Sequence, residues 1–375
     1  MTTIEEVNKA LDENKVQVVC QVAPALRVSI GEEFGYAPGT ILTKKLVGAL
    51  KEAGFDRVFD TSTAADVVTA EEGTEFLKRL RTGECLPLFT SCCPASILYV
   101  ENNFPHYVDH FCTVKSPQQT MGSLIKTYYA RALGLKQKDL YSVSIMPCVV
   151  KKLEAKRPEM EFDGIRHVDA VLTTRDIAKL LKDRGIDLKK SKETEFDSLL
   201  GDASGGGQLF GVTGGVCEAL LRFVSYKLDP KKKRIDFKEI RGSKGFREKE
   251  ITIKGKKYKV AIIHGLHNLK DLLSNEKKFQ KYHVIELMVC PSGCIGGGGQ
   301  PISTPEIREA RRKALIKVDA KEKERLCVDN PEFKKLYKDY LGTPGSRTAV
   351  SLLHTQRICL KCNSILSEKI KQDLD

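Results

Sequence analysis

Three short hydrophobic segments of this chain each end in a cysteine-bearing turn, and this repeated pattern constrains the fold more than any other feature. The segments are LPLFTSCCPAS (86–96), SVSIMPCVVKKLE (142–154) and VIELMVCPSGCIGGGGQP (284–301). Runs rich in Val, Ile, Leu and Phe that stop at proline or glycine are typical of buried strands. In open α/β sheets, ligands collect at the carboxyl ends of the strands. Four thiols at such strand ends match the all-cysteine ligand set of an iron–sulfur cluster: Cys93, Cys148, Cys290 and Cys294.

Strand-like and helix-like segments alternate along the rest of the chain. Strands are predicted at 15–24, 56–60, 86–92, 142–148, 169–174, 259–265 and 284–290, and amphipathic helices at 43–55, 70–81 and 174–186. This alternation predicts an α/β fold with parallel or mixed sheets flanked by helices. Because 375 residues exceed what one hydrophobic core usually organises, we expect two lobes with the cofactor in the cleft between them. The expected parts are about 1–135 for the first lobe, 136–301 for the second and 302–375 for a helical C-terminal region.

The chain is basic, with 62 Lys and Arg residues against 49 Asp and Glu and a formal net charge of +13 at pH 7. This charge fits either an acidic partner or an ordinary lysine-rich solvated surface. In the most basic segment, 230–258, the basic residues alternate with acidic and apolar ones, as in exposed hairpin strands. No zinc-finger, RNP or helix-turn-helix signature accompanies it, so we expect no nucleic-acid partner.

The expected location is cytoplasmic, without membrane insertion. No apolar run approaches the length of a membrane span, and the segment MTTIEEVNKALDENKV lacks the basic and apolar regions of an export signal. Twelve cysteines in a reducing compartment indicate metal binding or catalysis rather than disulfides.

The segment CPSGC places two thiols four positions apart, and a run of four glycines follows at 296–299. Glycines let the backbone approach a ligand closely and leave several N–H groups free to point at sulfide or another anion. A lone pair of this spacing also fits two core cysteines, but the other cysteines at strand ends favour a cluster. The spacing fits neither a zinc knuckle nor a two-cluster ferredoxin.

These segments resemble the three signature motifs of [FeFe]-hydrogenases, which stand here as TSCCP (90–94), MPCVVKKLE (146–154) and ELMVCPSGCIGGGGQP (286–301). Further segments that look like parts of the same catalytic domain are QVAPALRVSIGEEFG (21–35), DTSTAADVVTAEEGTEF (60–76), KSPQQTMG (115–122), FGVTGGVCEA (210–219) and SLLHT (351–355). The resemblance therefore covers nearly all of the chain. It begins almost at residue 1, so we expect a form reduced to the catalytic domain, without the N-terminal ferredoxin-like domains of many relatives.

The resemblance implies a composite cofactor. Cys93, Cys148, Cys290 and Cys294 would bind a [4Fe–4S] cluster, and Cys294 would also bridge to a diiron subsite that carries CO, cyanide and an azadithiolate, the two together forming the H-cluster. The implied reaction is the reversible conversion of two protons and two electrons to hydrogen, with electrons exchanged with an acidic, ferredoxin-like carrier. It also implies that maturation enzymes supply the diiron unit.

A proton route is implied as well. Neighbouring residues at a strand end point in different directions, so Cys92 does not duplicate Cys93; by resemblance, its thiol exchanges protons with the diiron subsite, the alternative being a spare buried cysteine. Glu72, Glu75 and Arg79 fall on one helical stripe and match the outer relay of the family, although the same stripe fits a solvated helix face. Cys112 stands where many relatives have serine, and a thiol is the weaker hydrogen-bond partner.

Other positions are expected to contact the cofactor. Lys151 should donate to a cyanide ligand, since a buried ammonium needs an anionic partner, unless it is an ordinary surface lysine. Met146 and Met288 share the strand face of the cysteine two residues on. The family also places Ala23, Pro24, Gln118 and Phe210 around the diiron unit. Ala25 and Ser96 depart from the common family choices, serine and tryptophan.

Two questions stay open at this level. Cys359 and Cys362 form a C-x2-C pair that fits either half of a further metal site or a reduced tail. The alternative function is a non-catalytic relative, either a hydrogen or redox sensor or an iron–sulfur assembly factor. The assembly branch lacks an intact diiron site, whereas this chain keeps Cys92, Lys151 and both methionines, so an enzyme is the favoured interpretation.

Overall fold

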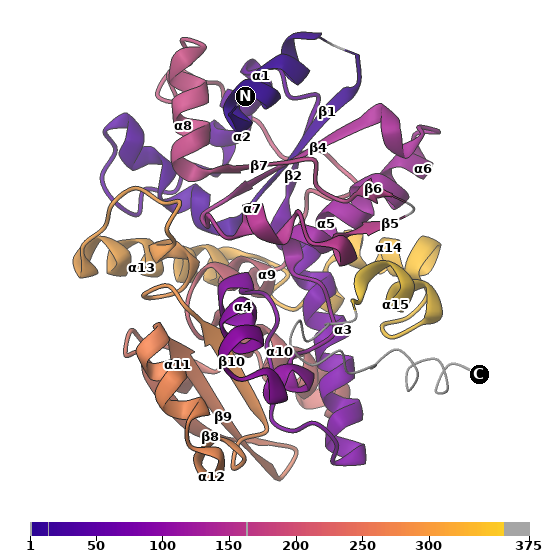
Figure 1. Cartoon of the computed structure of the whole chain (residues 1–375), viewed down its shortest axis with the longest axis vertical. Coiled ribbons are helices and arrows are strands. Elements are labelled where there is room, and N and C mark those ends of the chain that lie inside the picture. Colours follow the sequence, from indigo (N-terminus) through magenta and orange to yellow (C-terminus); the bar gives the residue numbers. More distant parts are fainter. Residues whose placement is uncertain (1, 14, 163, 356–375) are drawn as a thin grey trace.

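Two four-stranded sheets organise the part of the chain that the computed structural model describes, residues 2–13, 15–162 and 164–355. The first sheet has the order β2-β1-β4-β7 and is parallel throughout. The second has the order β3-β10-β9-β8, in which β8 alone is antiparallel to its neighbour. The first sheet lies in the upper half of Figure 1 and the second in the lower half. The predicted α/β class with parallel and mixed sheets is confirmed.

The strands follow the predicted hydrophobic runs within a few residues, apart from short additions. Their bounds are β1 (Gln17–Val22), β2 (Arg57–Asp60), β3 (Leu88–Phe89), β4 (Leu140–Met146), β5 (Glu161–Phe162), β6 (Ile165–Arg166), β7 (Ala170–Thr173), β8 (Phe246–Ile253), β9 (Lys256–His264) and β10 (Val284–Met288). The basic segment does form a hairpin, β8–β9, in which acidic and basic side chains alternate on the exposed half of β8. The pair β5–β6 was not predicted.

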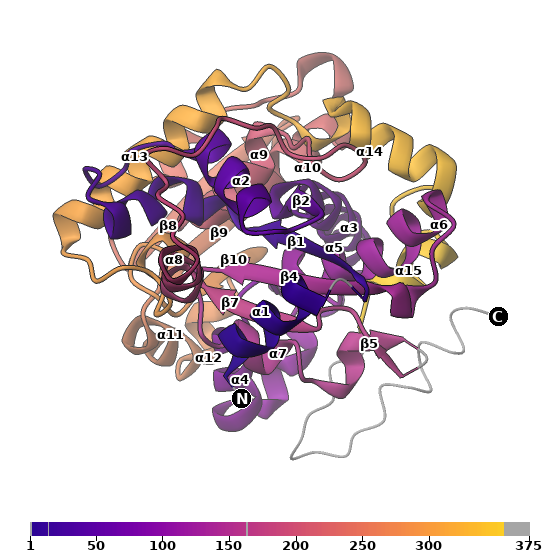
Figure 2. The ribbon, with the colours of Figure 1, turned by 90° about the horizontal axis from the view of Figure 1, so that it is seen from above.

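Helices cover both sheets and make up most of the C-terminal part. Their bounds are α1 (Thr3–Glu13), α2 (Thr43–Glu52), α3 (Thr61–Thr82), α4 (Pro94–Asn103), α5 (Pro117–Leu124), α6 (Ala130–Ala132), α7 (Lys151–Glu154), α8 (Thr174–Asp183), α9 (Gly205–Gln208), α10 (Gly215–Leu228), α11 (Leu266–Leu273), α12 (Glu276–Phe279), α13 (Pro305–Lys321), α14 (Pro331–Leu336) and α15 (Arg347–Leu353). Figure 2 shows α1, α2 and α8 over one face of the first sheet. None of the helices in the described ranges is both long and apolar enough to cross a bilayer.

The predicted division of the sheets at about residue 135 is wrong. β3 belongs to the second sheet although it precedes this point, and β4 and β7 belong to the first sheet although they follow it. The chain thus passes from the first sheet to the second, back to the first, and again to the second. The reason is that β1 pairs along its whole length with β4, from Gln17 opposite Leu140 to Val22 opposite Ile145. Such long-range pairing has no local sequence signal.

Helix α3 starts at the end of β2 in the first sheet, packs against α5, α9 and α10, and carries part of the candidate site. It begins directly after β2, where the Asp60 carboxylate accepts a hydrogen bond from the Ser62 N–H at 2.9 Å and caps the helix. It therefore starts well before the predicted residue 70. Its first three turns are buried on all sides, including the acidic side chains of Asp66, Glu71 and Glu72.

Candidate functional site

The structure brings together the four predicted cluster cysteines from both sheets. Cys93 precedes α4, Cys148 lies between β4 and α7, and Cys290 and Cys294 follow β10. Each is partly buried. Burial raises the pKa of Cys290 to about 12, and the neighbouring thiols of Cys148 and Cys93 add to the rise. The pKa of Cys294 is likewise raised by burial and then by the three other thiols. All four side chains thus lie within electrostatic reach of one another.

The surroundings of the thiols fit an iron–sulfur cluster. Among the described residues, no group of three or more His, Cys, Asp or Glu side chains has the spacing of a single-ion site. Backbone N–H groups of Val150 and Lys151 donate to the sulfur of Cys148, and the N–H of Gly298 donates to that of Cys290. Such bonds favour the thiolate, which is the form that binds iron.

The glycine run works differently from the prediction. The N–H groups of Gly296, Gly297 and Gly299 donate to backbone carbonyls of Gly293, Cys294 and Pro147 at 2.9–3.0 Å, so they are not free for sulfide. Of the four, Gly298 alone has its N–H on a cysteine sulfur. A Cβ on Gly297 would lie 2.3 Å from the Pro147 carbonyl oxygen. The run therefore lets the CPSGC loop pack directly against the loop that carries Cys148.

This packing gives a testable contrast between two neighbouring glycines. Gly297→Ala should destabilise the protein by about 1–3 kcal/mol because the added methyl meets rigid backbone. Gly298→Ala is the matched control: its Cβ would meet only a Val149 methyl group at 3.8 Å. Thermal unfolding of both variants checks the prediction. An equal loss of stability in the two variants would contradict the packing role.

Cys92 lies between the cluster cysteines and the acidic residues of α3. Burial raises the pKa of its thiol, and the neighbouring Cys294, Cys93 and Glu72 raise it further. Its backbone carbonyl accepts a hydrogen bond from Lys151 Nζ at 3.2 Å. The thiol thus lies within electrostatic reach of the cluster cysteines Cys93 and Cys294 and of Glu72 on α3.

Lys151 is buried and pairs within the protein. Its Nζ lies 2.8 Å from Glu154 Oε2, one turn along α7. The same carboxylate oxygen accepts from Ser116 Oγ at 2.9 Å and from Gln118 Nε2 at 3.0 Å. The predicted surface alternative for Lys151 is wrong, because the side chain is only 10% exposed.

Glu154 was missed as a site residue although it closes the motif MPCVVKKLE. Its spacing of three from Lys151 on a helix was the available signal. Gln118, expected to face the cofactor, holds Glu154 through Nε2 and accepts from Ser144 Oγ through Oε1 at 2.9 Å. A buried network that consists of Glu154, Ser116, Gln118 and Ser144 therefore holds the Lys151 ammonium in place.

Glu286, the first residue of the third motif, was also missed. It lies in the middle of β10 at 0% exposure, and its carboxylate accepts from the N–H groups of Gly214 and Cys217 at the start of α10. A carboxylate in a buried strand was the signal, since such a group needs a partner. It ties the strand that leads to Cys290 to α10.

The predicted relay residues lie together on α3 and not on a solvated face: Glu72 and Arg79 are buried and Glu75 is partly buried. Glu72 is 1% exposed and accepts from the N–H of Ser91, the residue before Cys92, at 3.3 Å. Glu75 accepts from Arg79 at 2.5 Å and from Cys112 Sγ at 3.1 Å. Burial works to raise the pKa of Glu75, but the Arg79 guanidinium and these hydrogen bonds bring it below its ordinary value.

Arg79 has a structural task that the sequence did not reveal. Besides Glu75, its guanidinium donates to the backbone carbonyls of Cys85, Asp109, His110 and Phe111 at 2.9–3.2 Å. It thereby clamps the segment before Cys112 onto α3.

The other expected cofactor contacts are buried, most of them at strand ends. Ala23 and Pro24 follow β1, Met146 and Met288 end β4 and β10, and Phe210 lies in the 3-10 helix Leu209–Gly211. Ser96 is 0% exposed and donates to the Cys93 carbonyl at 2.8 Å, which gives this small side chain a fixed place beside the cluster loop. Cys359 and Cys362 lie outside the described residues.

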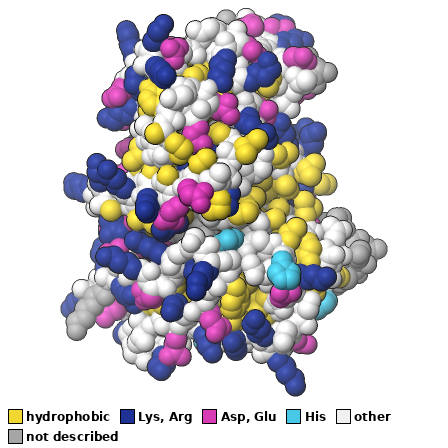
Figure 3. Space-filling model, turned by 90° about the vertical axis from the view of Figure 1, so that its left-hand side faces the viewer, with side chains coloured by type: hydrophobic (Ala, Val, Ile, Leu, Met, Phe, Trp, Pro, Cys, Tyr) yellow, Lys and Arg dark blue, Asp and Glu magenta, His cyan; other side chains and the backbone are white. Residues whose placement is uncertain are grey.

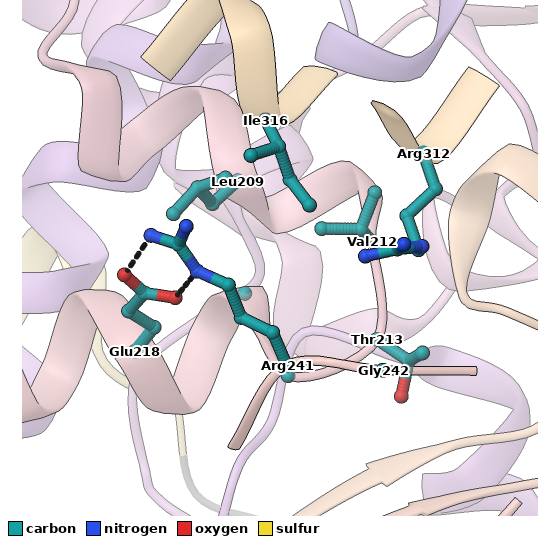
Figure 4. A pocket seen from close by; sticks show the side chains of 10 residues that line it. Leu209, Val212, Thr213, Glu218, Arg241, Gly242, Arg312 and Ile316 are labelled. Carbon is teal, nitrogen blue, oxygen red and sulfur yellow. Dashed lines mark hydrogen bonds and ion pairs between the residues drawn. The ribbon is translucent and has the colours of Figure 1, made fainter. Parts of the chain in front are cut away.

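A small surface pocket lies beside the CPSGC loop but contains none of the predicted site residues (Figure 4). Thr213, in its wall, donates its N–H to the Ser292 carbonyl at 3.1 Å. Arg241 reaches across the pocket to form two hydrogen bonds with Glu218. Because Arg241 and Glu218 neutralise each other, we place the candidate chemistry at the cysteine site and not in this pocket.

Comparison with known proteins points to one family. The description "Iron only hydrogenase large subunit, C-terminal domain" matches residues 16–298, and "Iron hydrogenase small subunit" matches residues 305–356. Iron hydrogenase 1 of Clostridium pasteurianum is 40% identical over 362 residues, which are 94% of this chain and 62% of that relative. Cytosolic iron-sulfur assembly component 3 of Pongo abelii is 34% identical over 384 residues, covering 94% of this chain and 78% of that protein.

A solved structure gives the same result for the fold. A variant of [FeFe]-hydrogenase HydA1 from Chlamydomonas reinhardtii superimposes with a TM-score of 0.84 at 36% sequence identity. The match covers 96% of this chain and 99% of that one.

Proposed function

This chain belongs to the iron-only hydrogenase family, and we propose that it is an [FeFe]-hydrogenase that catalyses the reversible conversion of two protons and two electrons to hydrogen. The observation that carries the proposal is the meeting of four cysteines from both sheets with Cys92 and the buried Lys151. The chain spans less than two thirds of the length of Iron hydrogenase 1.

In this proposal Cys93, Cys148, Cys290 and Cys294 hold a [4Fe–4S] cluster, with Cys294 shared with a diiron subsite bearing CO, cyanide and an azadithiolate. When bound, this composite group supplies the iron at which protons and electrons combine. Lys151, held by Glu154, presents an ammonium toward the anionic ligands. Met146, Met288, Phe210, Ala23 and Pro24 exclude water from the site.

Protons move through side chains of the chain itself. Cys92 holds or releases a proton at Sγ. Glu72, whose carboxylate accepts from the Ser91 N–H, is the next proton carrier. Glu75, hydrogen-bonded to Cys112, continues the route toward Arg79. The proximity of Cys92 to Glu72 and the hydrogen bond from Cys112 Sγ to Glu75 support this order of proton carriers.

Cys112→Ser tests the weakest link of this route. A hydroxyl donates and accepts more strongly than a thiol, so we expect hydrogen turnover to rise by about fivefold, the factor that corresponds to about 1 kcal/mol of hydrogen-bond energy. Turnover measured with a chemical electron donor at saturating concentration checks this. An unchanged or lower rate would show that the Cys112 thiol does not limit proton transfer.

The proposed electron partner is an acidic, ferredoxin-like carrier. Figure 3 shows Lys and Arg side chains scattered over one face, with Asp and Glu among them, around hydrophobic side chains that gather across its middle. Near Cys148, Val149 and Leu153 are 47% and 58% exposed. Basic surface with exposed apolar side chains supports the docking of an acidic protein. The proposal also includes maturation enzymes as partners, which deliver the diiron unit. The proposed location of the protein is the cytoplasm.

The second candidate is a non-catalytic role as a sensor or an iron–sulfur assembly factor. The 34% identity to Cytosolic iron-sulfur assembly component 3 supports the assembly role as this alternative. The assembly role differs from the enzyme in the need for Cys92 and for the buried Lys151–Glu154 pair, because a protein without a diiron unit would not require them. Their joint presence favours the enzyme.

The test is hydrogen evolution from reduced viologen under anaerobic conditions, after the cluster-bearing protein has been loaded with a synthetic diiron complex. The proposal predicts sustained hydrogen production. No production, with infrared bands of CO and cyanide proving that the complex is bound, would favour the second candidate.

A further inference from the structure

A continuous series of hydrogen bonds leads from Glu75 to a second carboxylate on α3, Glu71. Thr113 Oγ1 lies 2.7 Å from Glu75 Oε2 and 2.8 Å from His354 Nδ1. His354 Nε2 lies 3.1 Å from Glu71 Oε2. Four side chains thus form three links in series, and none of them belongs to the cluster loops.

Backbone pairing fixes this arrangement. The segment after α15 pairs with the segment 113–115: Lys115 N–H donates to the Leu353 carbonyl and Thr355 N–H to the Thr113 carbonyl, both at 2.8 Å. Glu71 is held by the Tyr337 hydroxyl at 2.6 Å, from the π-helix Tyr337–Leu341, and by the Gly345 N–H at 2.8 Å. The series is therefore a preformed part of the fold.

Counting hydrogens shows that the series carries more than the ordinary ionisation states supply. Three hydrogen bonds in series need three hydrogens. The Thr113 hydroxyl provides one and a neutral imidazole at His354 provides a second. The third is an additional proton on Glu75, His354 or Glu71. Burial supports this count, because the Glu71 side chain is 0% exposed and an ionised carboxylate there needs a positive partner such as the imidazolium.

We propose that Glu75, Thr113, His354 and Glu71 store one extra proton as a side arm of the proton route, an inference that rests on the proposed function. With the proton on Glu75 Oε2, its transfer to Thr113 Oγ1 releases the hydroxyl hydrogen to His354 Nδ1. His354 then gives its Nε2 hydrogen to Glu71 Oε2. Three bonds to hydrogen break and three form, and the charge has moved along the whole series. The reverse shift returns the proton to Glu75.

Other charged and titratable groups face this arm. Arg79 and Cys112 contact Glu75, and Tyr337 contacts Glu71. Lys115 Nζ donates to the Leu352 carbonyl beside His354 at 2.9 Å. Because Arg79 stabilises ionised Glu75, the resting position of the proton is the His354–Glu71 end.

The proton count can be measured without turnover on the full chain that carries its iron–sulfur cluster. Protein labelled with 15N-histidine would show the His354 ring, identified by its loss in His354→Gln. We expect either a ring protonated on both nitrogens at pH 7 or an infrared band of a protonated carboxyl that disappears in Glu71→Gln or Glu75→Gln. A ring with one proton and no such band would overturn the proposal. His267→Gln, at an exposed histidine that lies outside this series and pairs with Asp271, is the control.

Turnover then tests the storage role. A proton store matters most when protons are scarce, so His354→Gln should lower hydrogen evolution at least about threefold more at pH 8 than at pH 6. Thr113→Val, which cuts the series at a different link, should give the same pH profile. An equal loss at both pH values would indicate a merely structural His354 and overturn the storage role. If the protein evolves no hydrogen at all, the proposed function fails, while the proton count still decides whether the arm holds a proton.

Discussion

Replacing Cys92 by alanine is expected to lower hydrogen evolution by at least about 100-fold while the iron–sulfur cluster and the diiron group stay bound. The thiol is next to a cluster ligand and interacts with Glu72, but it is not itself among the four ligands in the proposed site. Its loss therefore removes a proton carrier without removing a ligand. Viologen-driven turnover, iron content and the infrared bands of CO and cyanide, measured on the same sample, check the prediction.

Cys217→Ala is the matched control for this substitution. Cys217 is another buried thiol, also within electrostatic reach of Glu72, but it lies in α10 and is not among the four proposed ligands. It should lose little activity. Equal losses in the two variants would mean that the Cys92 effect comes from the packing of a buried thiol and not from proton transfer.

Replacing Cys294 by alanine is expected to abolish hydrogen evolution and to lower the iron content below that of the wild type. This thiol interacts with the three other cluster cysteines, and the proposed diiron subsite shares it. The backbone of the loop should persist, because the Cys294 carbonyl still accepts from Gly297 N–H. Losing a ligand should also lower the melting temperature, since a bound cluster stabilises the folded state.

The control for Cys294→Ala is Cys20→Ala, a fully buried cysteine in β1 with no place in the proposed site. It removes a thiol from the first hydrophobic core and should leave the iron content unchanged. Full iron content and activity in Cys294→Ala would contradict its assignment as a ligand.

The sequence predicted the local part of the site well. Each cysteine follows a strand whose hydrophobic run and terminating proline or glycine are local signals, so the positions of Cys93, Cys148 and Cys290 at strand ends could be read directly. The stripe of Glu72, Glu75 and Arg79 was equally accessible, because residues three and four apart share a helix face.

The long-range part could not be read in this way. The strand order depends on the pairing of β4 with β1, which lie more than a hundred residues apart in the chain. The hydrophobic pattern of a strand does not indicate which other strand it pairs with. The contact of Thr113 with His354 depends on pairing between segments that lie 241 positions apart. Glu154 and Glu286 were within reach, since a buried carboxylate in a motif always needs a partner.

Hydrogen isotope exchange tests most directly whether this chain is a hydrogenase. The protein loaded with the diiron complex is kept under D2 in ordinary water, without any electron carrier, and the gas is analysed for HD by mass spectrometry. We expect HD, because Cys92 and the relay behind it exchange protons between the site and water, whichever direction of net turnover is favoured. No HD from protein whose infrared bands confirm a bound diiron group would contradict the claim that this chain is a hydrogenase.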